Sequence, residues 1–162
     1  MKAASIHEIR QELGSLPSSR LSELCLRLAK FRMDNKELLT YLLFESDDEG
    51  AYIAQVKEEI DLGFKELPKP NLYLTKKSLR KALRAMLKQV RYIGSAQAEV
   101  ELLSYFLRKM QTSRIPYKDS PVLSNLYRQQ LRKANSAMET LHEDLQYDYR
   151  KMLQGLEEGS VP

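Results

Sequence analysis

The fold of this chain is governed by a basic amphipathic stretch, which reads Thr75-Lys-Lys-Ser-Leu-Arg-Lys-Ala-Leu-Arg-Ala-Met-Leu-Lys-Gln-Val-Arg-Tyr-Ile93. On a helix, where successive residues are about 100° apart, its Lys and Arg side chains fall within one arc of about 140° and its large apolar side chains within another. The apolar side must pack against other helices, and the charged side must face water, an acidic surface or an anionic ligand. Lys76 lies in the charged arc, and the candidate nucleic-acid or anion-binding residues are Lys77, Arg80, Lys81, Arg84, Lys88 and Arg91.

Charge is distributed unevenly along the chain. Residues 67–133 hold fifteen Lys or Arg and three Asp or Glu, whereas residues 1–66 hold nine against thirteen and residues 134–162 hold two against six. This distribution suits an anionic partner for the middle segment, and it equally suits acidic flanks that fold back onto it. The basic face therefore has three interpretations: a solvated or internally paired surface, a nucleic-acid site, or a site for an acidic protein.

Nucleic acid is the first ligand to consider for the basic stretch. Cations along one helix face can meet successive phosphates, and aromatic rings beside them can stack on bases. The apolar stripe is needed for the core, which argues against binding to a membrane surface. If the C-terminal helix packs alongside, the supporting cations are Lys118, Arg128, Arg132 and Lys133, and the candidate stacking residues are Tyr73, Tyr92 and Tyr117.

Length and composition indicate a single domain. With 162 residues, the chain can bury about two-thirds of its unfolded surface around one core. We expect an all-helical domain over residues 1–162, with an elbow at residues 67–71, where two prolines interrupt the helical pattern, and a disordered tail at residues 157–162. The N-terminal residues carry charges where a signal peptide needs an apolar core, and no apolar run is long enough to span a membrane. We therefore expect a cytoplasmic protein.

Apolar residues recur at spacings of three and four along nearly the whole chain, which predicts helices throughout. Ser5 is a suitable N-cap for the first helix, and Gly94 followed by Ser95 is typical of a tight turn between antiparallel helices. Ser120 or Asp119 as a cap before Pro121 marks a further helix start. We predict an all-α fold of six to eight helices in stacked antiparallel hairpins, arranged as a short α-solenoid-like stack or a helical bundle.

Residues 122–154 contain no Gly or Pro and predict a long C-terminal helix. Unbroken, it would extend about 50 Å, so we expect a bend near Asn135, because Asn is a poor helix former. Its apolar residues alternate at spacings of four and three, which is typical of a bundle or coiled-coil seam. We expect this seam to pack within the chain, with a homo-oligomer through the C-terminal helix as the alternative. The seam residues are Tyr127, Leu131, Ala134, Met138, Leu141, Leu145 and Met152.

An internal repeat relates two apolar segments of the chain. Glu37-Leu-Leu-Thr-Tyr-Leu-Leu43 and Glu101-Leu-Leu-Ser-Tyr-Phe-Leu107 are identical at five of seven positions. Each segment follows an amphipathic helix, so the pair indicates two copies of a helical hairpin. Stacked helix pairs of this kind are typical of solenoid proteins.

Several segments, taken in order, carry a resemblance to a known family. They are Leu21-Ser-Glu-Leu-Cys-Leu-Arg-Leu28, Asp34-Asn-Lys-Glu-Leu-Leu-Thr-Tyr-Leu-Leu43, an acidic helix, the Lys/Arg-rich helix and Glu101-Leu-Leu-Ser-Tyr-Phe-Leu107. This order resembles a bacterial family of small all-helical proteins of unknown function. The resemblance covers about residues 5–112, and the long C-terminal helix departs from the family pattern. It implies an all-helical fold and a cytoplasmic setting, with no activity or site residues.

Few residues in the sequence suit catalysis or metal binding. There is no Gly-rich phosphate loop and no Cys/His cluster. Glu139 and His142 share a helix face and match one half of a di-iron ligand set, but that site needs the pair twice. Cys25 falls on an apolar helix face, where we expect a buried, inert thiol. We predict no catalytic residue, metal or cofactor and a non-enzymatic binding or scaffolding protein. The alternative is an enzyme with a site assembled from Tyr, Glu and His, which a deep polar pocket around His142 or Cys25 would favour.

Overall fold

The chain forms two compact helical units. The computed structural model describes residues 1–158, with one unit at Met1–Ser46 and the other from Asp47 onward. We expected one domain with an elbow at residues 67–71, but the division lies at Ser46, and residues 67–71 instead connect two helices of the second unit. The main hydrophobic core is built from residues between Ile53 and Leu156, all in the second unit, which explains why this unit is compact by itself. The disordered tail was predicted at residues 157–162, but Glu157 is the last residue of the final helix; residues 159–162 lie outside the described residues.

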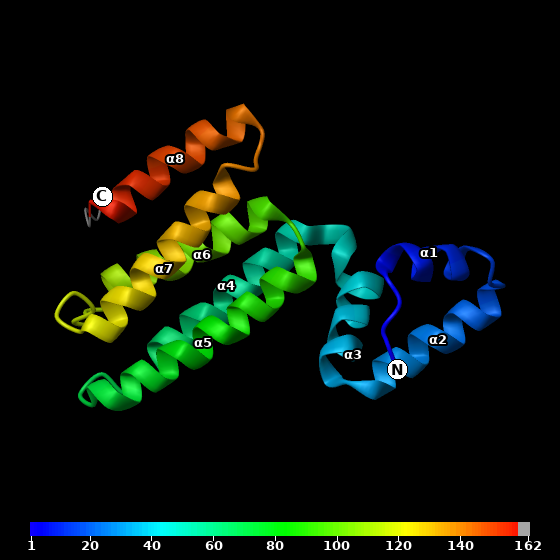
Figure 1. Cartoon of the computed structure of the whole chain (residues 1–162). Coiled ribbons are helices and arrows are strands. Elements are labelled where there is room, and N and C mark those ends of the chain that lie inside the picture. Colours follow the sequence, from blue (N-terminus) through cyan, green and yellow to red (C-terminus); the bar gives the residue numbers. More distant parts are fainter. Residues whose placement is uncertain (159–162) are drawn as a thin grey trace. The chain divides into compact units, whose positions relative to one another are not determined.

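Residues 1–158 contain helices and no strand, so the prediction of an all-α fold with six to eight helices is confirmed (Figure 1).

In the first unit, Ser5 begins the first helix with a capping box. Its hydroxyl accepts a bond from the Glu8 backbone N–H at 3.3 Å, and its own backbone N–H donates to the Glu8 carboxylate at 2.7 Å. The elements are α1 (Ile6–Gly14), α2 (Ser18–Phe31), α3 (Met33–Thr40), a π-helical turn η1 (Tyr41–Glu45) and a 3-10 turn η2 (Ser46–Asp48).

The first unit buries little apolar surface. Tyr41 is its one buried residue, while Phe31 and Phe44 are 79% and 75% exposed. Cys25 is exposed as well, which corrects the expectation of a buried thiol. The reason is that α3 packs against α2 but covers its apolar side only in part, so no residue of α2 is fully buried.

In the second unit, α6 (Ala96–Thr112) occupies the centre, where it packs against four other helices. Figure 1 shows it between the α4–α5 hairpin and the α7–α8 hairpin. Leu102 and Leu107 lie about 140° apart around α6, and both are completely buried. A helix that is apolar on most of its circumference is stable only when neighbours cover it. The surrounding helices are α4 (Glu49–Lys65), α5 (Leu72–Ile93), α7 (Pro121–Met138) and α8 (Glu143–Glu157).

Local caps define the ends of these helices as predicted. Gly94 ends α5 with a φ of 68°, a left-handed conformation that glycine adopts without strain. Ser95 then starts α6, because its hydroxyl accepts a hydrogen bond from the Ala98 backbone N–H at 3.3 Å. Ser120 caps α7 in the same way, with Pro121 in the first turn.

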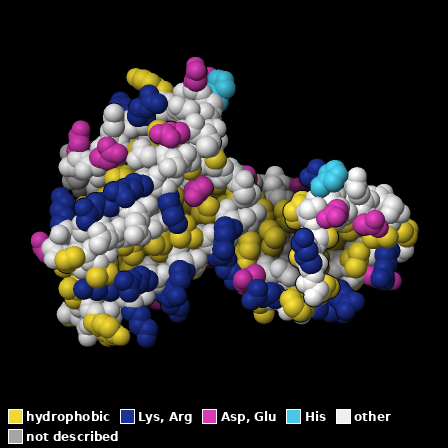
Figure 2. Space-filling view, viewed as in Figure 1, with side chains coloured by type: hydrophobic (Ala, Val, Ile, Leu, Met, Phe, Trp, Pro, Cys, Tyr) yellow, Lys and Arg dark blue, Asp and Glu magenta, His cyan; other side chains and the backbone are white. Residues whose placement is uncertain are grey.

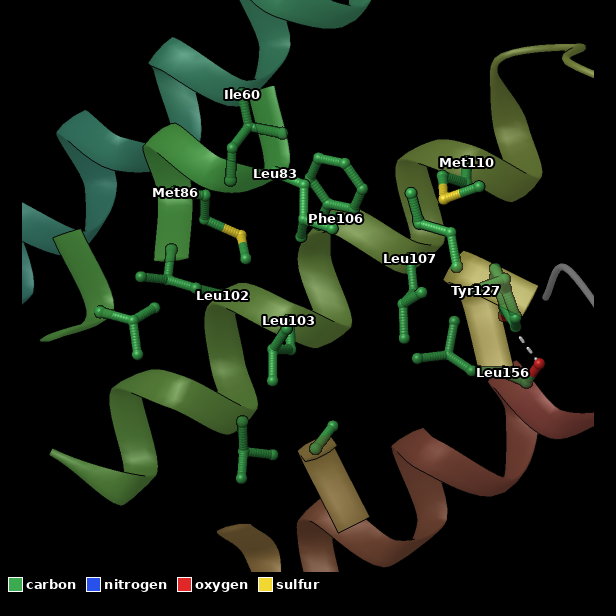
Figure 3. Close-up of a cluster of buried hydrophobic side chains, with 14 of the residues drawn as sticks. Ile60, Leu83, Met86, Leu102, Leu103, Phe106, Leu107, Met110, Tyr127 and Leu156 are labelled. Carbon is green, nitrogen blue, oxygen red and sulfur yellow. Dashed lines mark hydrogen bonds between the residues drawn. The ribbon is translucent and has the colours of Figure 1, made fainter. Parts of the chain in front are cut away.

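The core of the second unit is built from apolar side chains of all its helices (Figure 3). Phe64 of α4 and Phe106 of α6 meet edge to face, with ring centroids 5.1 Å apart. At the other end of the core, the Tyr127 hydroxyl of α7 donates a hydrogen bond to the Leu156 carbonyl oxygen of α8 at 2.8 Å. The core therefore holds α8 against α7 as well as α4 against α6.

The C-terminal segment is two helices and not one helix bent at Asn135. The last residue of α7 is Met138, and α8 begins at Glu143. Asn135 lies within α7, whereas His142 caps α8 by accepting a hydrogen bond at Nδ1 from the Asp144 backbone N–H at 3.4 Å. The turn lets α8 pack back on α7 and α6, where it buries apolar surface that a continuous helix would leave in water.

Candidate nucleic-acid interface

Five cations of α5 face solvent without acidic partners in the described part of the chain. Among residues 1–158, no carboxylate forms an ion pair with Lys77, Arg80, Lys81, Arg84 or Arg91, all of which are exposed. Acidic flanks folded back onto α5 would have produced such pairs. Within that part of the chain, these cations are therefore not paired internally. Two interpretations of the basic face remain, a solvated surface and a binding site.

A cleft of about 530 Å³ lies along the N-terminal half of α5. Like charges that line a concave surface reinforce one another's potential and concentrate anions there. Figure 2 shows Lys and Arg side chains gathered over α5 and over α7 on the face in view, with hydrophobic side chains between the two helices. We call this depression the basic cleft, and its lining residues are Tyr73, Lys76, Lys77, Arg80, Leu83, Arg84 and Val122.

The cleft cations share one face of α5 because of their spacing. Lys77, Arg80 and Arg84 are separated by three and four residues, which brings side chains onto the same side of a helix. The Nε of Arg84 donates to the Arg80 carbonyl oxygen at 3.3 Å, which orients its side chain back along the helix. The terminal guanidinium N–H groups of Arg84 are left to bind an anion in the fork geometry that suits phosphate.

Lys81 belongs to a different surface. It lines a groove of about 250 Å³ between α4 and α5, together with Glu59 and Glu66. Those carboxylates give that groove a mixed charge, so it is less suited to a polyanion than the basic cleft. The helix rotates by about 100° between neighbouring residues, which is why Lys81 turns away from Arg80.

Lys88 and Arg91 line neither of these depressions. The Nζ of Lys88 lies 6.0 Å from the centre of the Tyr92 ring, at the edge of cation–π distance. Arg91 is exposed in the last turn of α5. Of the predicted site residues, the structure therefore brings Lys77, Arg80 and Arg84 together in the cleft.

None of the supporting cations expected in or before the C-terminal helix lines the basic cleft. Arg128 donates to the Asn125 side-chain oxygen at 2.7 Å, within α7. Arg132 and Lys133 are exposed farther along α7, and Lys118 is exposed in the loop before it. The first turn of α7 reaches the cleft through Val122, which is the contact that forms one wall.

Of the three candidate stacking tyrosines, only Tyr73 is free to stack on a ligand. It is 73% exposed and lines the basic cleft. Tyr92 is buried at 8% exposure. Tyr117 is stacked on Tyr127, with centroids 4.9 Å apart and an interplanar angle of 22°. The aromatic contribution to the site therefore comes from the first turn of α5.

Three residues that line the cleft are absent from the predicted site, and they are Lys76, Leu83 and Val122. Lys76 shares the cationic arc but was left out of the candidate set, although its spacing of four from Arg80 places it on the same side of the helix. Val122 lies on another helix, and its position against α5 is a tertiary contact that the sequence does not encode locally.

Among residues 1–158, no group of three or more His, Cys, Asp or Glu side chains is arranged to hold a metal ion. His142 is exposed at the start of α8, and Cys25 is exposed on α2. In the same part of the chain, no helix combines the length and the apolar character needed to cross a lipid bilayer.

No protein-family model, curated protein or solved structure matches this chain. The resemblance to a bacterial family of small all-helical proteins stays a prediction. Function must therefore be inferred from the geometry and charge of the residues themselves.

Proposed function

We propose that this protein is a non-enzymatic binding or scaffolding protein that binds nucleic acid through the basic cleft. The observation that carries this proposal is the gathering of Lys76, Lys77, Arg80 and Arg84 around one concave surface, with no ion-pair partner for them among residues 1–158. Cations that neutralise phosphates release condensed counterions, which makes the affinity high at low salt.

The chemistry of the cleft favours recognition of the phosphate backbone. Lys and Arg contacts to phosphates position a nucleic acid but carry no sequence information. The cleft contains no Asn, Gln, Asp or Glu side chain, and the Lys and Arg side chains that could read base edges are the same ones that would contact phosphates. We therefore expect binding to mixed sequences with similar affinity.

A salt series with labelled DNA and RNA of mixed sequence tests the proposal. Log K should fall linearly with log salt, by about 0.9 per neutralised phosphate on duplex DNA and about 0.7 on a single strand. Replacing Lys76, Lys77, Arg80 and Arg84 together by Gln should flatten that slope by about 3 if each of them contacts a phosphate. Circular dichroism verifies that the variant keeps its helices.

A matched control removes the same charge elsewhere in the second unit. Lys65, Arg108, Arg150 and Lys151 are exposed on other helices, and replacing them by Gln should leave the slope nearly unchanged. Equal effects of the two variants would mean that net charge alone attracts nucleic acid. Absence of binding by the wild-type protein at about 50 mM salt would remove the nucleic-acid proposal.

The alternative is a protein-interaction module whose cleft binds an acidic partner. The same cations would then pair with the carboxylates of an acidic surface. Binding of polyglutamate by the wild type, lost in the cleft variant and accompanied by no binding to DNA or RNA, would favour this function.

We retain two further proposals from the sequence. A cytoplasmic location is supported by Cys25, which is a free and exposed thiol. A homo-oligomer through the C-terminal helices would require α8 to leave its own core or to exchange between copies, because Tyr127, Ala134 and Met138 of the seam are buried. Sedimentation at micromolar concentration tests the oligomer, and a strictly monomeric protein removes it.

A further inference from the structure

The aromatic ring in the basic cleft has no partner of its own. Tyr73 lies in the first turn of α5, where Asn71 caps the helix by accepting from the Leu74 backbone N–H at 3.1 Å. Among residues 1–158, its hydroxyl makes no hydrogen bond and its ring no stacking contact. An exposed ring that the fold does not use is available to a ligand.

The ring and the cations form one line along α5. Tyr73, Lys77, Arg80 and Arg84 are spaced by four, three and four residues, so they follow the same face of the helix. At 1.5 Å per residue, this line extends about 16 Å. A strand lying along it would meet the ring at one end and successive cations beyond it.

Apolar side chains also line the cleft. Leu83 of α5 and Val122 of α7 contribute to it, and Val122 is 37% exposed. Duplex nucleic acid presents phosphates and groove edges to a protein, because its base faces are stacked inside. A single strand offers the faces of its bases, which suit a tyrosine ring and an apolar wall.

The dimensions of the cleft agree with this chemistry. Its volume of about 530 Å³ falls within the range of pockets that hold a small ligand, about 300 to 1,000 Å³. A flat row of cations would bind the phosphates of a duplex as well as those of a single strand. The hollow beside Tyr73 gives an unpaired base a place to enter.

We propose that the basic cleft binds unpaired nucleic acid, with a base stacked on Tyr73 and the adjoining phosphates on Lys77, Arg80 and Arg84. This inference rests on the proposed function, and it adds the class of ligand and the residue that selects it. RNA and single-stranded DNA share the recognised features, so both are expected to bind.

The experiment compares a labelled single strand, RNA or DNA, with the duplex of the same sequence by fluorescence anisotropy. Wild-type protein should bind the single strands more tightly. Tyr73→Leu should weaken single-strand binding by about 5- to 150-fold, the range for loss of one base–aromatic stack, and should leave the salt slope unchanged. Tyr73→Phe should retain wild-type affinity, because the ring and not the hydroxyl makes the contact.

Tyr147 supplies a matched control, because it is also 73% exposed but lies on α8. Tyr147→Leu should have no effect on binding. The chain contains no Trp, so Tyr73→Trp places a single indole at the cleft, and its fluorescence should be quenched by the single strand and not by the duplex.

Two outcomes would overturn the inference, and they are distinguishable. If single strand and duplex bind equally with a normal salt slope, and Tyr73→Leu changes neither, the single-strand assignment fails while the proposed function stands. If no nucleic acid binds at about 50 mM salt, the proposed function fails together with the inference.

Discussion

Tyr105 of α6 donates its hydroxyl proton to the Asp61 carboxylate of α4, with its oxygen 2.8 and 2.9 Å from the two carboxylate oxygens. The Nζ of Lys109 lies 2.7 Å from the same carboxylate. Lys57 and Lys109 lie 5.4 and 5.3 Å from the centre of the Tyr105 ring, so the ring is held near two cations. Lys57 also pairs with Glu101 at 2.5 Å. This polar network joins α4 to α6 beside the hydrophobic core.

We predict that Tyr105→Phe lowers the free energy of unfolding by about 1 to 2 kcal/mol, because it removes a hydrogen bond to a charged group. Urea unfolding followed by circular dichroism measures the change. A double-mutant cycle with Asp61→Asn should show that the two substitutions are coupled. Additive effects would contradict the assigned hydrogen bond, and Tyr147→Phe on α8 provides a control without a partner.

The pH dependence of stability should reveal the same network. Burial raises the pKa of Asp61, but hydrogen bonds from Lys109 and Tyr105 and the charge of Lys109 outweigh burial and hold the pKa below its usual 3.8. The folded state therefore binds this proton less readily than the unfolded chain. Its stabilising contribution is complete above about pH 4 and is lost as the pH falls through the folded-state pKa.

We expect Asp61→Asn to be less stable than wild type at neutral pH, with the difference shrinking toward about pH 3. At the alkaline end, the hydrogen bond to Asp61 raises the pKa of Lys109 above 10.5. The stabilising contribution of Lys109 is present below about pH 10.5 and is lost as the pH rises through its folded-state pKa. Unfolding midpoints across the pH range test both ends, and a difference that is constant with pH would contradict the prediction.

Equivalent positions of the internal repeat should respond differently to the same substitution. Leu107 is completely buried in α6, whereas Leu43 is 61% exposed in η1. Leu107→Ala should cost about 2 to 5 kcal/mol, because it leaves a cavity in the core. Leu43→Ala should change stability by less than about 0.5 kcal/mol, as is usual at the surface. Comparable costs in urea unfolding would show that Leu43 is covered in solution.

Hydrogen exchange should report on the attachment of α8. The Tyr127 hydroxyl accepts from Gln111 at 2.8 Å and donates to the Leu156 carbonyl oxygen at 2.8 Å. Tyr127→Phe removes both bonds, but only the bond to Leu156 attaches α8. Its loss should make the backbone amides of α8 exchange about 2- to 12-fold faster, as expected for one hydrogen bond. The amides of α5 serve as the internal control, and unchanged exchange in α8 would contradict this role of Tyr127.

The sequence by itself determined where most helices of the second unit begin and end. Gly94 and Ser95 produce the turn between α5 and α6, and Ser120 with Pro121 starts α7, as predicted. These signals are reliable because each involves a backbone conformation or a hydrogen bond within one turn of the chain. The amphipathic character of α5 was predictable for the same reason, since it depends on residues three and four apart.

Tertiary structure decided which apolar residues are buried. The two copies of the repeat have nearly the same sequence, yet Leu107 lies in the core and Leu43 faces solvent. Periodicity identifies an apolar face but not the helix that will cover it. Cys25 was predicted to be buried on this ground and is exposed.

Tertiary structure also decided the shape of the candidate site and the course of the C-terminal segment. The charged arc of α5 contains Lys76 and Lys81 alike, but Lys76 lines the basic cleft and Lys81 a separate groove beside Glu59. The rotation of the helix turns Lys81 toward α4, and Val122, far away in sequence, closes one wall of the cleft that Lys76 lines. In the same way, α8 turns back at residues 139–142 because packing against α6 buries more apolar surface than a continuous helix would. Helix capping and apolar periodicity depend on residues that are close together in the chain. The shape of a cleft and the burial of a side chain depend on which distant helix packs against them.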